Sequence, residues 1–265
     1  MLIDSIEIKK NNHHNYPFNL PLFWNDINLK TNNPVTFFVG ENGCGKSSLI
    51  KILQAKLHLY EIKIPNQDIK DRIDAKSVTI TPSLKKLKGF YFESLTFINY
   101  IEYIQKEIAD SKAEIERVDK EYKFKSEYSK ILAKSPYNRT INELTTMYSK
   151  DLSKSSHGES YLDFFASRIK DNQIYLLDEP ETPLSIQNQL TLMAIIMDAI
   201  KRGCQFIIAT HSPILTAIPD SLIYEIKRNK FYKTKYEDIE SIQLLKQFLN
   251  NKEQFLKHLS SEEKA

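Results

Sequence analysis

A stretch rich in glycine ends in a lysine followed by two serines, and these residue types together favour phosphate chemistry. It runs from Gly40 to Ser48 and has the sequence GENGCGKSS. The spacing fits the pattern G-x-x-x-x-G-K-[ST], in which the glycines let main-chain N–H groups approach a phosphate closely. The lysine of this pattern reaches the terminal phosphates, and the hydroxyl that follows it binds Mg²⁺. The stretch therefore predicts a loop that binds a nucleoside triphosphate.

The residues on either side predict the strand and the helix that must position this loop. An apolar run over residues 35–39 is typical of a buried strand, and apolar residues recur at helical spacing over residues 49–53. In this order the N-terminus of the helix points its main-chain N–H groups at the phosphates. Ser47 is the expected metal ligand, and Lys46 is expected to be catalytic. We expect the nucleotide to contact Asn42, Gly43, Cys44, Gly45, Lys46, Ser47 and Ser48.

A second apolar run, residues 173–177, ends in two adjacent acids, Asp178 and Glu179. At a strand end beside a phosphate site, the first acid holds Mg²⁺, directly or through water, and the second acts as general base on the attacking water. The pair predicts hydrolysis of the bound nucleotide, with Asp178 as a metal ligand and Glu179 as the catalytic base.

The remaining pattern predicts how these motifs meet. Residues 184–202 have the apolar stripe of a helix. Alternating strands and helices indicate a largely parallel sheet covered on both faces, and ligands bind at the carboxyl ends of such strands. The glycine loop, Asp178 and His211 all follow predicted strands, so we expect them at one edge of the sheet. Further strands are predicted at residues 2–9, 78–80, 89–92, 205–209 and 222–226.

A long amphipathic stretch, residues 95–133, predicts a helix that the dipeptide Ser135-Pro136 ends. The stripe either packs on its own domain or forms a short coiled-coil arm. Residues 236–259 also alternate charged and apolar side chains at helical spacing. In the long stretch Ser111 is the one polar member of the stripe, whose apolar members are Ile101, Ile104, Ile108, Ile115, Val118 and Tyr122.

Length and composition narrow the class of protein. A chain of 265 residues, 41% hydrophobic and 27% charged, suits one large or two small α/β domains of a soluble protein. The net charge of +3 does not demand a nucleic-acid partner. No apolar stretch approaches the roughly 20 residues of a membrane helix, and the N-terminus does not resemble a signal peptide. Two cysteines, Cys44 and Cys204, form no disulfide framework, so we expect a cytoplasmic protein.

Together these motifs resemble those of the ABC class of ATPases. More narrowly they resemble its soluble branch, which includes SMC and RecF-like heads and small stand-alone ATPases. Besides the glycine loop and the acid pair, residues 155–160 (SSHGES) resemble the ABC signature, and His211 is similar in position to the switch histidine. The resemblance covers almost the whole chain. It implies an α/β P-loop NTPase fold: an ABC-ATPase head with a mostly parallel sheet, an antiparallel β portion and an inserted helical lobe at about residues 95–165, in a single domain of residues 1–265.

The resemblance also implies a mechanism with ATP and Mg²⁺ as cofactors. In this class two ATP molecules lie between two heads, each held by the P-loop of one head and the signature of the other. The active form is then an ATP-stabilised homodimer. Ser156, Gly158 and Glu159 are implied to contact the nucleotide across that interface, and His211 to sense the γ-phosphate and orient the water.

Three positions depart from the class pattern. His157 replaces the first signature glycine, and Ser185 stands where transporter-type ATPases have an aspartate. The glutamine expected after the strand that follows the P-loop helix is missing. Glu93 occupies roughly its place, and we consider it a hypothetical substitute ligand. For adenine, Tyr16 and Phe18 fit stacking on the base and packing in the core equally well.

Three functions are compatible with these residues. The first is a soluble ATPase that uses nucleotide-driven dimerisation as a switch, in DNA maintenance or in defence against foreign DNA, with no membrane partner. The second is the nucleotide-binding subunit of an ABC transporter, against which the missing glutamine and aspartate count. The third is a regulatory module with little hydrolysis, against which Glu179 counts. Basic clusters at residues 85–88 and 227–235 leave nucleic acid or a protein effector open as partners.

Overall fold

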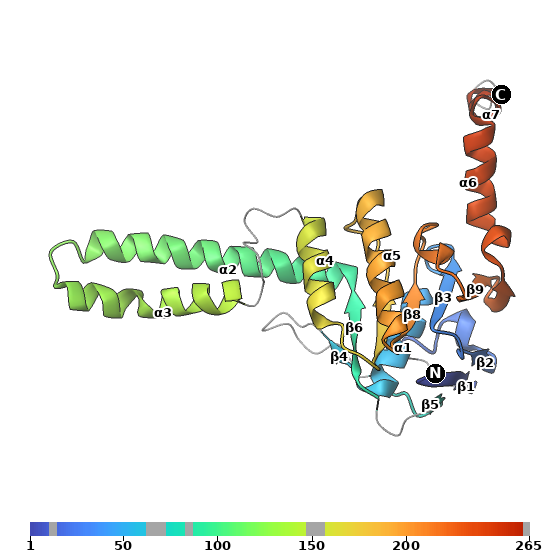
Figure 1. Cartoon of the computed structure of the whole chain (residues 1–265), viewed down its shortest axis with the longest axis horizontal. Helices are drawn as coiled ribbons and strands as arrows, with labels where there is room; N and C mark the ends of the chain where they lie inside the picture. The colour runs from blue at the N-terminus through green and yellow to red at the C-terminus, as the bar shows by residue number, and fades with distance from the viewer. Residues whose placement is uncertain (11–14, 62–72, 83–86, 147–156, 262–265) are drawn as a thin grey trace.

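A seven-stranded sheet forms the centre of the molecule, as the computed structural model shows for residues 1–10, 15–61, 73–82, 87–146 and 157–261 (Figure 1). The strands lie in the order β10-β9-β3-β8-β7-β6-β4. Every neighbouring pair from β9 to β4 is parallel, and β10 is antiparallel to β9. The strands are β3 (Val35–Gly40), β4 (Tyr60–Glu61), β6 (Gly89–Glu93), β7 (Ile174–Asp178), β8 (Gln205–Ala209), β9 (Leu222–Lys227) and β10 (Lys230–Thr234).

A smaller antiparallel sheet, in the order β2-β1-β5, packs beside the large one. Its strands are β1 (Ile3–Ile8), β2 (Ile27–Lys30) and β5 (Val78–Pro82). The predicted α/β class, with a mostly parallel sheet and an antiparallel β portion, is confirmed. The short helices are η1 (Pro21–Phe23), η2 (Leu215–Ala217) and η3 (Tyr236–Asp238).

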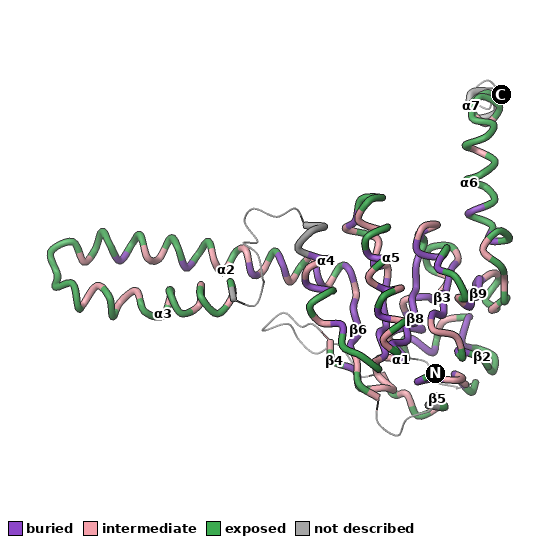
Figure 2. Tube along the Cα trace, viewed as in Figure 1, coloured by how far each residue is buried: buried purple, intermediate pink, exposed green. Residues whose placement is uncertain are grey.

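Two hydrophobic cores lie on opposite faces of the large sheet, because the side chains of a strand alternate between its faces. On one face Phe38, Leu176 and Ile207 pack against α1 (Lys46–Leu57) and the small sheet. On the other face Phe37 and Leu177 pack against the start of α2 (Ser94–Glu121), α4 (His157–Arg168) and α5 (Ile186–Lys201). The central strands β3, β7 and β8 are buried almost throughout (Figure 2), and burial on both faces explains their nearly continuous apolar sequences.

The side chain of Gln205 links the two sheets. Its Nε2 donates to the main-chain oxygens of Ile3 (2.9 Å) and Thr31 (2.6 Å), and its Oε1 accepts from the main-chain nitrogen of Ile3 (2.7 Å). Gln205 and Thr31 are fully buried. Because water does not reach these main-chain groups, this one amide satisfies polar groups that would otherwise be unpaired.

Replacing Gln205 with leucine is expected to lower the free energy of unfolding by about 2–4 kcal/mol, since each buried group left unpaired costs about 1–3 kcal/mol. Urea unfolding followed by circular dichroism measures the change. Gln243→Leu is the matched control, because Gln243 is exposed on α6 (Glu240–Asn250). A loss no larger than that of the control would show that the two sheets do not depend on this link.

The long amphipathic stretch forms two helices rather than one. The prediction of a helix over residues 95–133 that ends at Pro136 is wrong: α2 ends at Glu121, and α3 runs from Glu127 to Thr146 through Pro136. The oxygen Oγ of Ser126 accepts the main-chain N–H of Ser129 (3.2 Å) and thereby caps the start of α3. Pro136 is tolerated because it lies on the exposed side of α3, where water can bond the carbonyl group it frees.

The helices α2 and α3 form an antiparallel arm that extends from the sheet (Figure 1). The first turns of α2 belong to the core, where Phe97, Ile101 and Ile104 are buried. Beyond them the stripe faces α3, and Ser111 and Val118 are buried there. The start of the stripe therefore packs on its own domain, as one interpretation held, and the rest lies in a two-helix arm, as the other held. These helices and α4 lie in the range predicted for the helical lobe, while the assignment of the whole chain to one domain stays a prediction.

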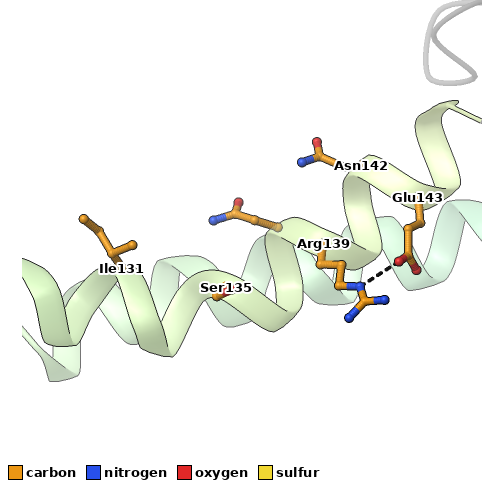
Figure 3. Close-up of a pocket in the computed structure, with 6 residues that line it drawn as sticks. Ile131, Ser135, Arg139, Asn142 and Glu143 are labelled. Atoms are coloured by element: carbon orange, nitrogen blue, oxygen red, sulfur yellow. Dashed lines mark hydrogen bonds and ion pairs between the residues drawn. The ribbon is translucent and has the colours of Figure 1, made fainter.

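The outer side of α3 is open to solvent. A shallow hollow there is lined by the side chains of Figure 3, and the Nε of Arg139 pairs with Oε1 of Glu143 at 2.7 Å. An exposed pair four residues apart on a helix contributes only a few tenths of a kcal/mol. The hollow lies on the arm, away from the strand ends that carry the predicted site (Figure 1).

The C-terminal helices also differ from the prediction. The helical spacing over residues 236–259 belongs to η3, α6 and α7 (Lys252–Ser261), and the chain leaves the helical path at Asn251. The helix α6 projects from the domain and is largely exposed (Figure 2). Within the described residues, no helix combines the length and the apolar character needed to cross a membrane.

Candidate nucleotide-binding site

The three predicted motifs meet at the carboxyl ends of three adjacent strands. The glycine loop follows β3, the acid pair lies at the end of β7, and His211 follows β8, which lies between β3 and β7. Because parallel strands present their carboxyl ends at one edge, the sheet order brings the motifs together.

The backbone of the loop has the conformation that its glycines predict. Gly43 has a φ of 78° and Gly45 a φ of 101°, in the left-handed region that favours glycine. A Cβ atom on Gly45 would lie 2.7 Å from Cδ2 of Leu22, so a side chain there would also have to displace Leu22. Gly45 precedes the first residue of α1, Lys46. Asn42 and Cys44 lie in the same loop. Because the loop leads directly into the N-terminus of α1, its conformation fits a phosphate bound there.

Lys46 is buried although it carries a charge. Its side chain is 3% exposed, and Nζ donates to the main-chain oxygens of Gly40 (2.9 Å) and Glu41 (2.9 Å). These carbonyl groups compensate a buried positive charge only in part. A phosphate at the loop supplies the negative charge that completes the compensation, so the lysine fits its predicted role.

A hydrogen bond joins the loop helix to the acid pair. Ser47 Oγ donates to Asp178 Oδ1 at 2.9 Å, and Asp178 is 3% exposed. Burial raises the pKa of Asp178 to about 7, the bond from Ser47 lowers it, and the charge of Glu93 raises it. Hydroxyl and carboxylate oxygens are ligands that Mg²⁺ accepts, together with phosphate oxygens. These two side chains fit a magnesium ion, which favours the ionised carboxylate.

Glu179 and His211 face each other across the site. Oε1 of Glu179 lies 3.8 Å from Nε2 of His211, and both side chains are about two-fifths exposed. Glu179 has a φ of 49°, which is uncommon for a residue with a side chain. Its main-chain N–H donates to Ala209 at 2.8 Å. Burial and the charge of Lys46 lower the pKa of His211, while Glu179 raises it. The lowered pKa favours the neutral imidazole, and solvent reaches both side chains.

The family comparison decides the class of this site. A family model described as "ABC transporter" matches residues 24–182, more than half of the chain. The chain belongs to the ABC transporter family. The chain is thus an ATP-binding ABC domain, and the matched range contains the glycine loop, Asp178 and Glu179, which stay the predicted site residues.

Solved structures of ATP-binding cassettes share the fold. A nucleotide-free ATP-binding cassette from an ABC transporter is 13% identical, with 91% of this chain and 94% of that chain covered and a TM-score of 0.53. MJ1267, an ATP-binding cassette of an ABC transporter, is 14% identical over 92% of this chain and 99% of that chain, with a TM-score of 0.51. At these identities the likeness shows the fold alone. No curated protein sequence matches the chain.

Glu93 lies beside Asp178, one of the two predicted metal ligands, and its charge raises the pKa of that carboxyl. It is paired with Asp178 in the register of β6 and β7. Its Oε1 is 2.7 Å from Nζ of Lys51, and its Oε2 accepts from Oγ1 of Thr96 at 2.7 Å. Both carboxylate oxygens are thus engaged by protein groups, which does not favour the hypothesis that Glu93 is a substitute ligand.

The two aromatic residues considered for adenine binding differ in how far they are exposed. Phe18 is 4% exposed and belongs to the core. Tyr16 is 54% exposed, and its hydroxyl lies 3.0 Å from Oγ of Ser48 in the loop helix. Burial thus favours packing for Phe18, while stacking on adenine stays a prediction for Tyr16, whose ring is accessible.

The structure describes the predicted signature residues only in part, and it adds one residue, Glu181, that the sequence analysis did not single out. Ser156 lies outside the described residues, while Gly158 and Glu159 fall in the first turn of α4. The sequence analysis did not predict a role for Glu181, whose Oε1 accepts the main-chain N–H of His211 at 2.6 Å. The only sequence feature that pointed to this residue is that it is an acid two positions after Glu179.

Proposed function

We propose that this chain is a Mg²⁺-dependent ATPase subunit that dimerises when it binds ATP and separates after hydrolysis. The bond between Ser47 and Asp178 carries the proposal, because it places the loop helix and the acid pair at one metal position. Lys46 binds the terminal phosphates, and Ser47 and Asp178 hold Mg²⁺, which neutralises phosphate charge when bound. Glu179 takes the proton of the attacking water, and His211 orients that water beside it.

The ATP-bound state is proposed to be a homodimer in which Ser156, Gly158 and Glu159 of one copy complete the site of the other. Support comes from the exposed edge at Glu179 and His211, which leaves room for a second copy. Light scattering of the Glu179→Gln protein with and without Mg-ATP tests this. A change from monomer to dimer is expected with ATP. An unchanged mass would contradict the homodimer.

A transporter is the favoured setting for this ATPase. The matching family is described as ABC transporter, and both solved cassettes come from ABC transporters. These findings support a nucleotide-binding subunit with a membrane partner over the soluble switch that the sequence favoured. Purification of the tagged full chain from solubilised cells tests the partner: an integral membrane protein is expected to co-purify in fixed ratio.

A soluble ATPase stays the second candidate because two residues differ from those of transporter-type ATPases: Glu93 stands in place of a glutamine, and Ser185 in place of an aspartate. Glu93 stands near the place of the transporter glutamine, with its carboxylate bound to Lys51 and Thr96. Ser185 caps α5 by accepting from the N–H of Asn188 at 3.3 Å. The basic clusters give nucleic acid little support. Lys227 is paired with two acids, Glu225 and Glu240, while Lys85 and Lys86 lie outside the described residues.

A further inference from the structure

We propose that Glu181 is a positioning residue that holds His211 against Glu179 through the main chain. Its carboxylate accepts the N–H of His211 at 2.6 Å, across 30 positions of sequence. The bond connects the turn after the acid pair with the loop after β8, which form two walls of the site. This inference rests on the proposed function. It adds Glu181 as the residue that fixes the distance between Glu179, the proposed base, and His211.

The turn that carries Glu181 is itself fixed. The N–H of Thr182 donates to the oxygen of Glu179 (3.1 Å), and the N–H of Leu184 donates to the oxygen of Glu181 (2.8 Å). The backbone of this turn therefore has little freedom, and the carboxylate of Glu181 reaches His211 from a fixed origin. A hydrogen bond to an ionised carboxylate is roughly twice as strong as a neutral one, so it restrains the N–H of His211 firmly.

The loop around His211 is anchored on both sides. Thr210 donates its N–H to the oxygen of Phe38 in β3 at 3.1 Å. Ser212 donates its hydroxyl to Oε1 of Gln189 in α5 at 2.7 Å. Neither bond holds His211 itself, whose main chain is fixed by Glu181. The N–H of Ser212 also donates to Oγ1 of Thr210 at 2.9 Å and closes the turn across His211. Loss of the bond to Glu181 releases the N–H of His211 within this turn, and we expect the imidazole to shift relative to Glu179.

Glu181 maintains this interaction at a cost. Burial raises the pKa of its carboxyl, and hydrogen bonds from the N–H of His211, from the side chain of Thr210 and from its own main chain lower it. Within the described residues, the second oxygen, Oε2, is buried with no hydrogen-bond partner. Burying a carboxylate with an unpaired oxygen is unfavourable, and a neutral side chain would avoid it. The restraint on His211 is the role that the hydrogen bonding of this carboxylate supports.

Two variants of similar shape separate acceptance of the N–H from packing. Glu181→Gln keeps an oxygen for the N–H of His211, whereas Glu181→Met does not. The methionine variant is expected to lower kcat by about 10- to 100-fold with little change in KM, because a misplacement of about 1 Å costs about 10²-fold. The glutamine variant is expected to recover most of the rate.

Glu225 gives a matched control. It is a buried glutamate, and its Oε1 likewise accepts a main-chain N–H, that of Glu240 at 3.1 Å, but at the start of α6. Glu225→Met is expected to change stability and to leave kcat within about threefold of the wild type, a change worth less than about 1 kcal/mol. An equal loss of kcat in the two methionine variants, or a glutamine variant as slow as Glu181→Met, would overturn the proposal.

The amide resonance of His211 in the nucleotide-free protein gives a readout apart from activity. Loss of the bond in Glu181→Met is expected to shift this proton upfield, and Glu181→Gln to restore part of the shift. If the wild type hydrolyses no ATP, the proposed function fails while this readout still tests the hydrogen bond. Should Glu181→Met not fold, Glu181→Ala is measured in the same way. An unmoved resonance in the non-accepting variant refutes the positioning role.

Discussion

Replacing Glu179 with glutamine is expected to leave ATP binding intact and to slow hydrolysis by about 10²–10⁴-fold, the usual loss when a positioned general base is removed. Glutamine keeps the shape of the side chain and the positive φ of the backbone. It cannot accept the proton of the attacking water. Because Lys46, Ser47 and Asp178 are untouched, the phosphates and Mg²⁺ keep their proposed ligands.

Single-turnover hydrolysis and calorimetric titration with Mg-ATP measure the two parts of this result. Glu253→Gln is a suitable control, since Glu253 is an exposed acid on α7. Hydrolysis at the wild-type rate by the Glu179 variant would assign the base to another residue. Weaker binding together with slower hydrolysis would show instead that Glu179 contributes to the nucleotide site in the ground state.

Replacing Lys46 with alanine is expected to have its largest effect on nucleotide affinity. A hydrogen bond to a charged group contributes about 1.5–3 kcal/mol, so removing each bond to a phosphate raises Kd by a factor of about 10–100. The variant also removes the bonds from Nζ to Gly40 and Glu41, so the empty loop has less support. Both effects weaken binding.

Calorimetric titration with Mg-ATP checks the affinity, and urea unfolding checks that the domain is still folded. Lys56→Ala is the matched control, because Lys56 lies near the other end of α1, where Nζ donates to Ala75. The control is expected to bind ATP as the wild type does. An unchanged Kd for Lys46→Ala would remove the lysine from the binding site.

The sequence was most informative where one residue type has one physical use. The apolar runs of β3, β7 and β8 predicted parallel strands because each is buried on both faces, and Gly43 and Gly45 occur where φ is positive. Such positions admit few alternatives. The motifs that follow these strands were therefore placed correctly at one edge of the sheet by order alone.

The features that were missed depend on neighbours distant in sequence. The strand β10 (KFYKT) is an exposed edge strand, and its lysines are typical of an edge that avoids further pairing, so it was assigned to a basic cluster. Pro136 was taken as a helix end, because its exposure on α3 is known only once α2 is placed. Glu181 meets His211 only through the turn after β7, which no local pattern indicates.

The strand order has a consequence for synthesis of the chain on the ribosome. The strand β3 carries the phosphate loop near the start of the sequence, yet both of its neighbours, β8 and β9, come from the last quarter. Until residues 205–227 have emerged, the nascent chain has no partner strand for β3, and pairing across so long a separation is slow. The nucleotide site is thus completed late in translation, and a truncated product that stops before β8 contains the whole glycine motif without a sheet to hold it.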